Sequence, residues 1–201
     1  DLHYPLRRQR QMCIRDRGKG VVKDEQEALR WYLLSAEQGN ASAQNTVGNN
    51  YYSGKGTVKD YNEALRWYKL SANQGNAWAQ YNLAGMYSKG KGVIENDQEA
   101  VKWYRLSADK GNSWSQNALG NMYYRGEGIE QNFQEAIKWY RLSAEKKYSW
   151  AQYNLGNIYD TGKGVVQDNQ EAFKWYKLAA KRGNKKAQYR LGLKYKDCLL
   201  Y

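Results

Sequence analysis

The chain has 201 residues, of which 26% are charged, and its formal net charge is +12. Its only histidine, proline and cysteines lie near the ends, at His3, Pro5, Cys13 and Cys198. The long interior therefore lacks the residues for a histidine-based catalytic triad, a cysteine nucleophile, a thiolate or imidazole zinc site, or a disulfide. No apolar run is long enough to span a membrane as a helix.

A Trp-Tyr pair recurs along the chain with a fixed spacing of 36 residues. A period of this size is typical of stacked supersecondary units, in which neighbouring units share one core. We therefore predict that the Trp-Tyr pairs are structural and lie in that core. The tryptophans are Trp31, Trp67, Trp103, Trp139 and Trp175.

Each unit predicts two helices. Helix B contains the Trp-Tyr pair and begins at Asp or Asn followed three residues later by Glu, which is the layout of a helix N-cap. It ends at Gly-Asn, where the glycine is expected to be left-handed. The capping pairs are Asp24/Glu27, Asp60/Glu63, Asn96/Glu99, Asn132/Glu135 and Asp168/Glu171, and the terminal glycines are Gly39, Gly75, Gly111 and Gly183.

Helix A lies between each Gly-Asn and the next Gly-x-Gly, and a Leu-Gly-x-x-Tyr motif gives it an apolar stripe. The recurring Gly-x-Gly is interpreted as a turn that needs positive φ, because no preceding strand or Gly-Lys-Ser/Thr supports a phosphate cradle. These pairs are Gly18/Gly20, Gly54/Gly56, Gly90/Gly92, Gly126/Gly128 and Gly162/Gly164.

No segment alternates apolar and polar residues as a strand would, so the predicted fold is an all-α solenoid of helix pairs. The period divides the interior, 18–196, into units. These are a half repeat 18–40, full repeats 41–76, 77–112, 113–148 and 149–184, and a half repeat 185–196.

One unit departs from the pattern, because Lys147-Tyr148 replaces Gly-Asn at the end of a helix B. A lysine held in the left-handed conformation costs on the order of 1 kcal/mol. We therefore predict a locally weaker junction at this place.

The combined motifs resemble a known family. Leu-Gly-x-x-Tyr is similar to the tetratricopeptide repeat, but the longer period, the Gly-x-Gly-Val loop and Ala-x-x-Trp-Tyr are typical of its relative, the Sel-1-like repeat. Residues 151–184, AQYNLGNIYDTGKGVVQDNQEAFKWYKLAAKRGN, carry nearly all of that pattern, and the resemblance covers 18–196. It implies a right-handed superhelix of antiparallel helix pairs and a role in protein–protein interaction.

Both ends depart from the period. Residues 1–17 include RRQRQMCIRD, and residues 197–201 end in CLLY. Both resemble translations, in opposite orientations, of a transposon-based sequencing-library adapter. We expect 1–17 and about 197–201 to be non-native and the interior to be a fragment of a longer reading frame. Without the five arginines and three aspartates of these ends, 27 basic and 17 acidic side chains remain, a net charge of +10.

Much of this charge lies in two columns of helix B that flank the Trp-Tyr pair. They suggest a basic stripe on the convex face for nucleic acid or an anionic surface. The favoured interpretation is a solvated face with local ion pairs, predicted as Glu99–Lys102, Glu135–Lys138, Arg105–Asp109 and Arg141–Glu145. The columns are Arg30, Arg66, Lys102, Lys138 and Lys174, and Lys69, Arg105, Arg141 and Lys177.

In the tetratricopeptide superfamily helix A lines the concave groove, and counting from Leu-Gly-x-x-Tyr gives the groove-facing positions. Their aromatic and amide side chains suit an extended peptide, because aromatics supply rigid contact area and amides pair with the peptide backbone. Trp78, Trp114 and Trp150 could instead close the seam between repeats. The candidate partner-binding residues are Trp78, Trp114, Trp150, Tyr81, Tyr153, Tyr189, Asn49, Asn117, Asn121, Asn157, Tyr52 and Tyr124.

The predicted function is a non-catalytic scaffold or adaptor that binds a protein or peptide on its concave helix-A face. No cofactor, metal or catalytic constellation is predicted, and no membrane span. Nucleic acid or an anionic surface, bound through the basic stripe of the B helices, is the alternative.

Overall fold

The computed structural model describes residues 24–198, and the predicted adapter-derived segment 1–17 lies outside them. This part of the chain forms ten helices and no strand, which confirms the all-α prediction. They are α2 (Glu25–Glu37), α3 (Ala41–Ser53), α4 (Tyr61–Asn73), α5 (Ala77–Tyr87), α6 (Asp97–Asp109), α7 (Ser113–Arg125), α8 (Phe133–Glu145), α9 (Ser149–Thr161), α10 (Asn169–Lys181) and α11 (Lys185–Cys198).

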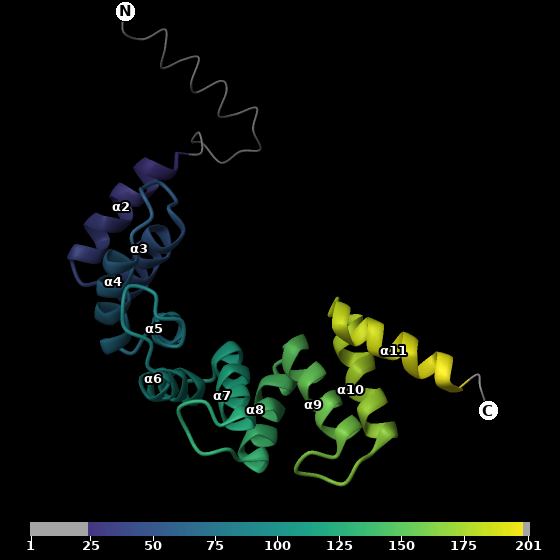
Figure 1. Ribbon diagram of the computed structural model, residues 1–201. Helices are drawn as coiled ribbons and strands as arrows, with labels where there is room; N and C mark the ends of the chain where they lie inside the picture. The colour runs from purple at the N-terminus through teal and green to yellow at the C-terminus, as the bar shows by residue number, and fades with distance from the viewer. Residues whose placement is uncertain (1–23, 199–201) are drawn as a thin grey trace, which may run out of the picture.

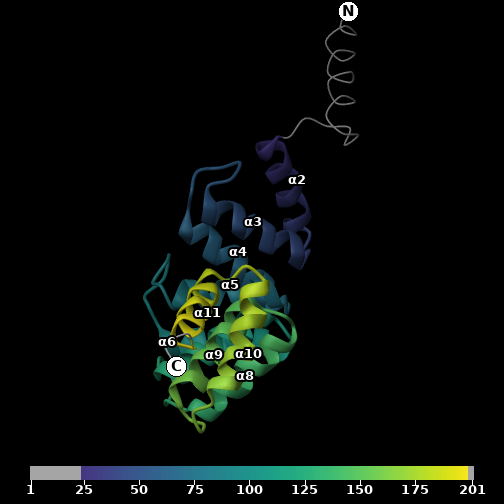
Figure 2. The same ribbon diagram turned by 90° about the vertical axis from the view of Figure 1, so that its right-hand side faces the viewer.

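The helices follow one another along a curved array, and each packs against its neighbours in the sequence. Figure 1 shows α3, α5, α7, α9 and α11, the predicted A helices, along the inner side of the curve. The B helices α2, α4, α6, α8 and α10 lie toward the outer side. Seen from the side, the same helices overlap as successive layers (Figure 2). The inner face is therefore built from A helices, as the repeat pattern predicts.

The B helices begin at the predicted caps. Asp60 Oδ1 accepts hydrogen bonds from the backbone N–H groups of Asn62 and Glu63, at 2.8 and 3.1 Å. Each of the other four caps makes the same bond to the N–H of the glutamate three residues on. Such a cap stabilises a helix by about 1 kcal/mol. The Gly-x-Gly glycines that the structure describes all have positive φ, as expected for a turn.

Two hydrogen bonds that the motifs do not predict recur along the array, one between neighbouring repeats and one within each repeat. A glutamine at the start of each A helix donates to the last turn of the preceding B helix, as Gln80 Nε2 does to the Ala72 carbonyl at 3.1 Å. A serine of helix B donates to the start of the preceding A helix, as Ser107 does to the Ala77 carbonyl at 2.6 Å. The glutamine thus adds a second bond to a helix-end carbonyl that also accepts from the Gly75 N–H.

From the second pair onward the Trp-Tyr pairs pack in the core, with Trp67 and Trp139 buried and Trp103 and Trp175 partly buried. Tyr68, Tyr104, Tyr140 and Tyr176 are all buried. The first pair corrects the prediction, because Trp31 and Tyr32 are 63% and 43% exposed. Their helix α2 packs mainly on α3, and no described helix precedes it, so one side of it has no neighbouring repeat in residues 24–198.

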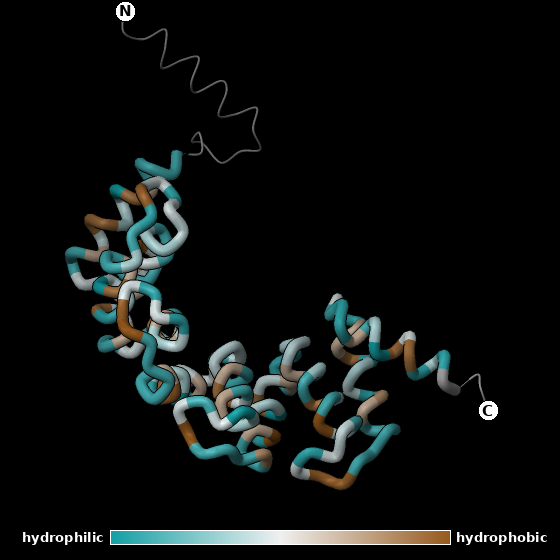
Figure 3. The backbone as a smooth tube through the Cα atoms, viewed as in Figure 1, coloured by the Kyte–Doolittle hydropathy of each residue, from teal (hydrophilic) through white to brown (hydrophobic). Residues whose placement is uncertain are grey.

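Hydrophobic residues form short stretches separated by hydrophilic ones along the helices (Figure 3). Within residues 24–198 no helix is long and apolar enough to cross a membrane.

The junction at Lys147 has the predicted conformation. Lys147 has φ of 67° and is the one non-glycine residue with positive φ in the described part of the chain. Tyr148 then occupies the N-cap of α9 without a side-chain capping bond, whereas Asn76 and Asn112 cap α5 and α7 through bonds of 3.0 Å. The junction therefore has both a strained backbone and an uncapped helix.

Replacing Lys147 with glycine is expected to raise the free energy of unfolding by about 1 kcal/mol, because glycine adopts this φ without strain. Urea unfolding measures the change. Gln38→Gly is the matched control, because Gln38 ends α2 at a φ of −76° that any residue adopts, so glycine gains nothing there. In the unaltered protein, amide hydrogen exchange should be faster at this junction than at those of Gly75 and Gly111. Equal rates at the three junctions would contradict the predicted weakness.

Candidate functional site: the inner face of the solenoid

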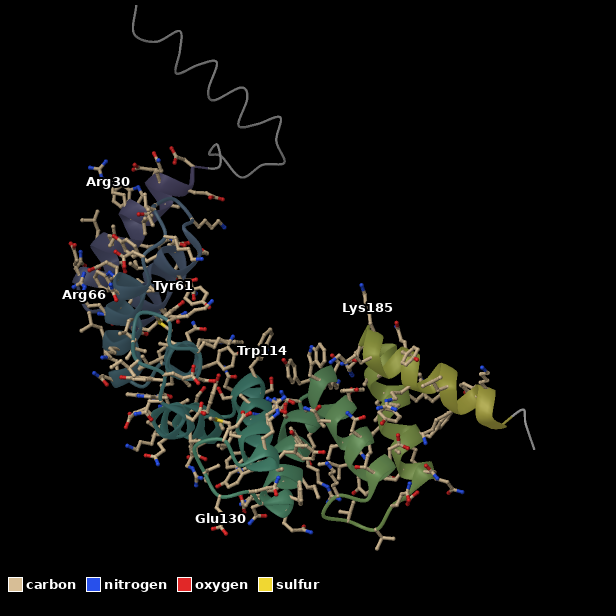
Figure 4. The ribbon with its side chains drawn as sticks, viewed as in Figure 1. Arg30, Tyr61, Arg66, Trp114, Glu130 and Lys185 are labelled. Carbon is tan, nitrogen blue, oxygen red and sulfur yellow. The ribbon has the colours of Figure 1, made fainter. Side chains whose placement is uncertain are left out.

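Half-exposed tryptophans line the inner face, one at the start of each of three successive A helices. Trp78, Trp114 and Trp150 are 49%, 44% and 43% exposed. The Trp78 and Trp114 ring centroids are 6.0 Å apart, and Tyr81 lies within about the same distance of both. Trp114 projects into the hollow of the curve in Figure 4. The tryptophans thus contact the next repeat and still present almost half of their surface to solvent.

Tyr148 extends this aromatic row. Its ring centroid lies 5.3 Å from that of Trp114, and burial raises the pKa of its hydroxyl to about 12. In the sequence, Tyr148 stands out only as a break in the Gly-Asn pattern. The structure shows that the lost N-cap is replaced by an aromatic contact. We name Trp78, Tyr81, Trp114 and Tyr148 the aromatic row.

Asparagines form a second row beside the aromatic one. Asn49 Oδ1 accepts from the Tyr68 hydroxyl at 2.8 Å and from Asn82 Nδ2 at 3.1 Å. Asn121 Oδ1 makes the equivalent pair of bonds with Tyr140 and Asn154, at 2.7 and 3.2 Å. These bonds occupy the carbonyl oxygens and leave the Nδ2 groups of Asn49 and Asn121 without a partner among residues 24–198. The row therefore presents hydrogen-bond donors to the groove.

Three other predicted partner-binding residues contact side chains of neighbouring helices. Asn117 is the least accessible of them, 8% exposed, and its Oδ1 accepts from Asn154 at 2.9 Å. Asn157 Oδ1 accepts from the Tyr176 hydroxyl at 2.7 Å. Tyr153 has its ring centroid 5.9 Å from that of Tyr176.

Tyr52 and Tyr124 lie near the far ends of their A helices. Their rings pack at an angle against the first residue of the following B helix, with centroids 5.2 Å from Tyr61 and 5.3 Å from Phe133. Tyr52 also accepts a hydrogen bond from Lys91 at 3.1 Å, which raises the pKa of that ammonium. At the C-terminal end of the array, Tyr189 is 68% exposed.

The second A helix breaks the pattern of the others. Three A helices carry Gly-Asn after their core Val or Leu (Gly48-Asn49, Gly120-Asn121 and Gly156-Asn157), but α5 carries Ala84-Gly85. A Cβ at Gly120 would lie 2.7 Å from the Tyr140 ring, and Gly48 and Gly156 are as close to their tyrosines. Because Ala84 has this Cβ, Tyr104 must sit farther out, and it is 8% exposed whereas Tyr140 is 2% exposed.

A concave pocket of about 400 Å³ opens at this irregular position. Helices α3 and α5 form its sides, with Asn49, Asn82 and Gly85 among the lining residues. Tyr68 and Tyr104 reach it from the B helices. The structure thus brings the predicted residues Asn49, Tyr52 and Tyr81 to one pocket.

The first basic column of the outer face is compensated by acidic side chains. All five residues of the first column form ion pairs with the glutamate three residues earlier, as Arg66 does with Glu63 at 3.0 Å. This confirms the predicted pairs Glu99–Lys102 and Glu135–Lys138. The predicted pairs of Arg105 with Asp109 and of Arg141 with Glu145 were wrong. Both guanidinium groups donate instead to tyrosine hydroxyls of the next A helix, those of Tyr123 and Tyr159.

Arg30 and Arg66 lie on the outer side of the curve in Figure 4, away from Trp114. Within the described residues, no group of three or more His, Cys, Asp or Glu side chains is arranged to hold a metal ion.

Sequence reasoning missed Tyr148, Asn82, Asn154 and Tyr104 as parts of the inner face. Asn82 and Asn154 are separated by two repeats, with Ala118 midway between them. Tyr81 and Tyr153 alternate in the same way with Asn45 and Asn117. These residues therefore recur every two repeats. Comparing positions 36 residues apart does not detect such a pattern, because the residue changes from one repeat to the next.

Known proteins of this architecture match the chain. A structure of a Sel1 repeat protein from Oxalobacter formigenes is 34% identical, with a TM-score of 0.82, covering 95% of this chain and 78% of that one. A protective antigen present in uropathogenic Escherichia coli strains is 38% identical, with a TM-score of 0.79. That match covers 92% of this chain, which spans only 40% of the length of the antigen.

An immunity protein from Pseudomonas aeruginosa is 18% identical, with a TM-score of 0.58 and coverage of 92% of this chain and 68% of that one, a likeness of fold alone. No curated protein is significantly similar in sequence. The Sel1 repeat pattern matches residues 9–40, 41–76, 79–112, 115–148, 151–184 and 185–201. With matches along nearly its whole length and two solved relatives above 30% identity, the chain belongs to the Sel1 repeat family.

Proposed function

We propose that the chain binds an extended peptide segment of a protein partner along the inner face of the solenoid. The observation that carries this proposal is the line of half-exposed tryptophans, Trp78, Trp114 and Trp150, on three successive A helices. Sel1 repeat proteins generally act as protein-interaction scaffolds. The location of the face and the extended form of the partner are specific to this proposal.

The two rows of the inner face supply complementary interactions. Trp78 and Trp114 offer rigid apolar surface, and aromatic residues of this kind contribute most strongly to binding at protein interfaces. The unpartnered Nδ2 groups of Asn49 and Asn121 can donate to main-chain carbonyls of a peptide. An extended chain presents such carbonyls at regular intervals, which suits donors that recur along the array.

The ring contacts between repeats do not remove the tryptophans from solvent. Trp114 touches Trp78, Tyr81 and Tyr148, yet it remains 44% exposed. A residue needed only to close a seam gains most stability when it is fully buried. Large apolar side chains gathered on one concave face are typical of an interaction site.

The ion pairs on the outer face argue against the electrostatic alternative. Because each cation of the first column is matched by a glutamate one helical turn away, the outer face has much less unpaired positive charge than the sequence suggests. Binding through the inner face should therefore depend weakly on ionic strength.

The test is selection of short random peptides on the purified protein, followed by affinity measurement with Trp114→Ala. Loss of a central aromatic is expected to weaken the selected peptides by at least roughly 30-fold. Leu106→Ala is the matched control, because Leu106 lies on α6 and is 46% exposed, close to the exposure of Trp114. Each variant is melted first, so that affinity is compared between folded proteins.

An unchanged affinity in Trp114→Ala would contradict the proposal, as would an equal loss in Leu106→Ala. A large fall in melting temperature without loss of affinity would assign the tryptophans to the seam. A steep fall in affinity with salt would favour the basic outer face.

A further inference from the structure

The row of asparagines has a gap in the second repeat. In three repeats the buried tyrosine of helix B donates its hydroxyl to an asparagine of helix A, at 2.7 to 2.8 Å. The corresponding position in α5 is Gly85, so the Tyr104 hydroxyl has no such acceptor. Within residues 24–198 this hydroxyl has no hydrogen-bond partner, and Tyr104, otherwise 8% exposed, lines the open pocket.

The neighbouring position lacks its asparagine as well. Asn82 and Asn154 donate to the asparagines of the preceding repeat, but the equivalent residue one repeat after Asn82 is Ala118. Two carboxamide groups that complete the network elsewhere are thus missing around Tyr104. The space beside them is the pocket between α3 and α5, which Gly85 and Tyr104 both line.

We propose that this pocket binds a primary carboxamide, the side chain of a glutamine or asparagine in a bound peptide, which takes the place of the missing asparagine beside Tyr104. This inference rests on the proposed peptide-binding function and specifies one residue of the peptide. The carbonyl oxygen of the carboxamide accepts from the Tyr104 hydroxyl, as Asn121 does from Tyr140 one repeat further on.

Two other polar residues of the pocket affect the choice between a carboxamide and a carboxylate: Asn82 favours the carboxamide, whereas Lys89, an exposed cation, favours the carboxylate. Asn82 donates both of its recorded bonds through Nδ2, to Asn45 and Asn49, which leaves its Oδ1 without a partner. The NH₂ of a carboxamide can donate to this oxygen, whereas a carboxylate would place a second acceptor against it. An aliphatic side chain would leave both Tyr104 and Asn82 unpaired.

The pocket is preformed on rigid elements. A Cβ placed on Gly85 would lie 3.6 Å from the Tyr104 hydroxyl, which is ordinary van der Waals contact, so a longer side chain can enter this space from the same direction. Burial raises the pKa of Tyr104, which keeps its hydroxyl protonated and able to donate at neutral pH.

The experiment titrates the protein with N-acetyl-glutamine methylamide and follows the backbone amide signals by NMR. Shifts are expected at Gly85 and its neighbours, with a dissociation constant on the order of millimolar for so small a ligand. Gly85→Asn places a carboxamide of the protein itself in the pocket and is expected to weaken binding of the compound by at least roughly tenfold. Tyr104→Phe removes the donor and is expected to weaken binding by a similar factor. Tyr140→Phe removes a hydroxyl that is already paired with Asn121, so this variant should bind the glutamine compound as tightly as the unaltered protein does.

N-acetyl-leucine methylamide should bind at least several-fold more weakly than the glutamine compound, and so should N-acetyl-glutamate methylamide when Lys89, which lines the pocket, is replaced with glutamine. Tyr104→Phe should leave the melting temperature unchanged, because its hydroxyl has no partner to lose, so weakened binding there does not reflect unfolding. No shift at Gly85, equal binding of the three compounds, or full binding by Gly85→Asn would overturn the inference. If peptides still bind through Trp114 in that case, the proposed function stands without this pocket. If the glutamine compound binds but Trp114 has no effect on peptides, the pocket stands and the proposed function fails.

Discussion

Replacing Gly128 with alanine is expected to lower the free energy of unfolding by about 3 kcal/mol, the largest effect of any single substitution considered for this chain. Gly128 has φ of 66° and follows α7 in the Gly-x-Gly loop. Its Cβ would fall well inside van der Waals contact with the backbone carbonyl of Asp97, the first residue of α6. A backbone group cannot rotate away as a side chain can, so relief requires two repeats to separate.

Gly126→Ala is the matched control. Gly126 also has a positive φ, 74°, but the nearest atom to an added Cβ is Cβ of Gln131 at 3.3 Å. Only the backbone strain remains, so the expected loss is about 1 kcal/mol. Urea unfolding followed by circular dichroism measures both variants. Because a solenoid is held together by contacts between adjacent repeats, Gly128→Ala should also broaden or divide the transition. Equal losses in the two variants would show that the contact with Asp97 is unimportant.

Alkaline pH is expected to unfold the protein from about pH 10 upward. Burial raises the pKa of Tyr68, Tyr104 and Tyr140 above the ordinary tyrosine value of 10.0. The folded state therefore retains these protons where the unfolded state releases them. Their contribution to stability is fully present below pH 10 and is lost as the pH rises toward the folded-state pKa.

The loss should be steep. The slope that each such tyrosine contributes approaches about 1.4 kcal/mol per pH unit above 10, so three together remove about 3 kcal/mol in the first unit. This is a large fraction of the whole stability of many domains. Urea unfolding at a series of pH values gives the slope, and tyrosinate absorbance reports the ionisation.

Tyr140→Phe provides the comparison. At neutral pH it should cost about 1 kcal/mol, because the hydrogen bond to Asn121 is lost. Above pH 10 its stability should fall less steeply, by about 1.4 kcal/mol per unit. If all tyrosines ionised near pH 10 while the protein stayed folded, the buried positions of Tyr68 and Tyr140 would be wrong.

Local features of the fold could be predicted because they depend on residues close together in the sequence. An Asp or Asn cap bonds to an N–H two or three residues away, and a left-handed helix end needs a glycine at one position. Even Lys147, which breaks the second rule, adopts the φ that its position in the repeat predicts. The exposure of Trp31 was not predictable in this way, because burial of helix α2 depends on what lies on its other side.

The candidate site could be predicted only in part. The period placed Trp78, Trp114 and Asn121 among the groove-facing positions. It did not show that Asn121 has its carbonyl oxygen committed to Tyr140, because that bond joins residues 19 positions apart on different helices. Nor did it identify Tyr148 as a neighbour of Trp114.

The sequence by itself determined the repeat, the two helices of each unit, their caps and turns, and the family. All of these follow from a regular spacing and from short-range backbone requirements. Only the tertiary structure decided which polar groups of the inner face are paired and which are free. Hydrogen bonding is sensitive to differences of a few tenths of an ångström in the distance between donor and acceptor. In α5 the replacement of Gly-Asn by Ala84-Gly85 is enough to leave the Tyr104 hydroxyl without a partner in the described residues.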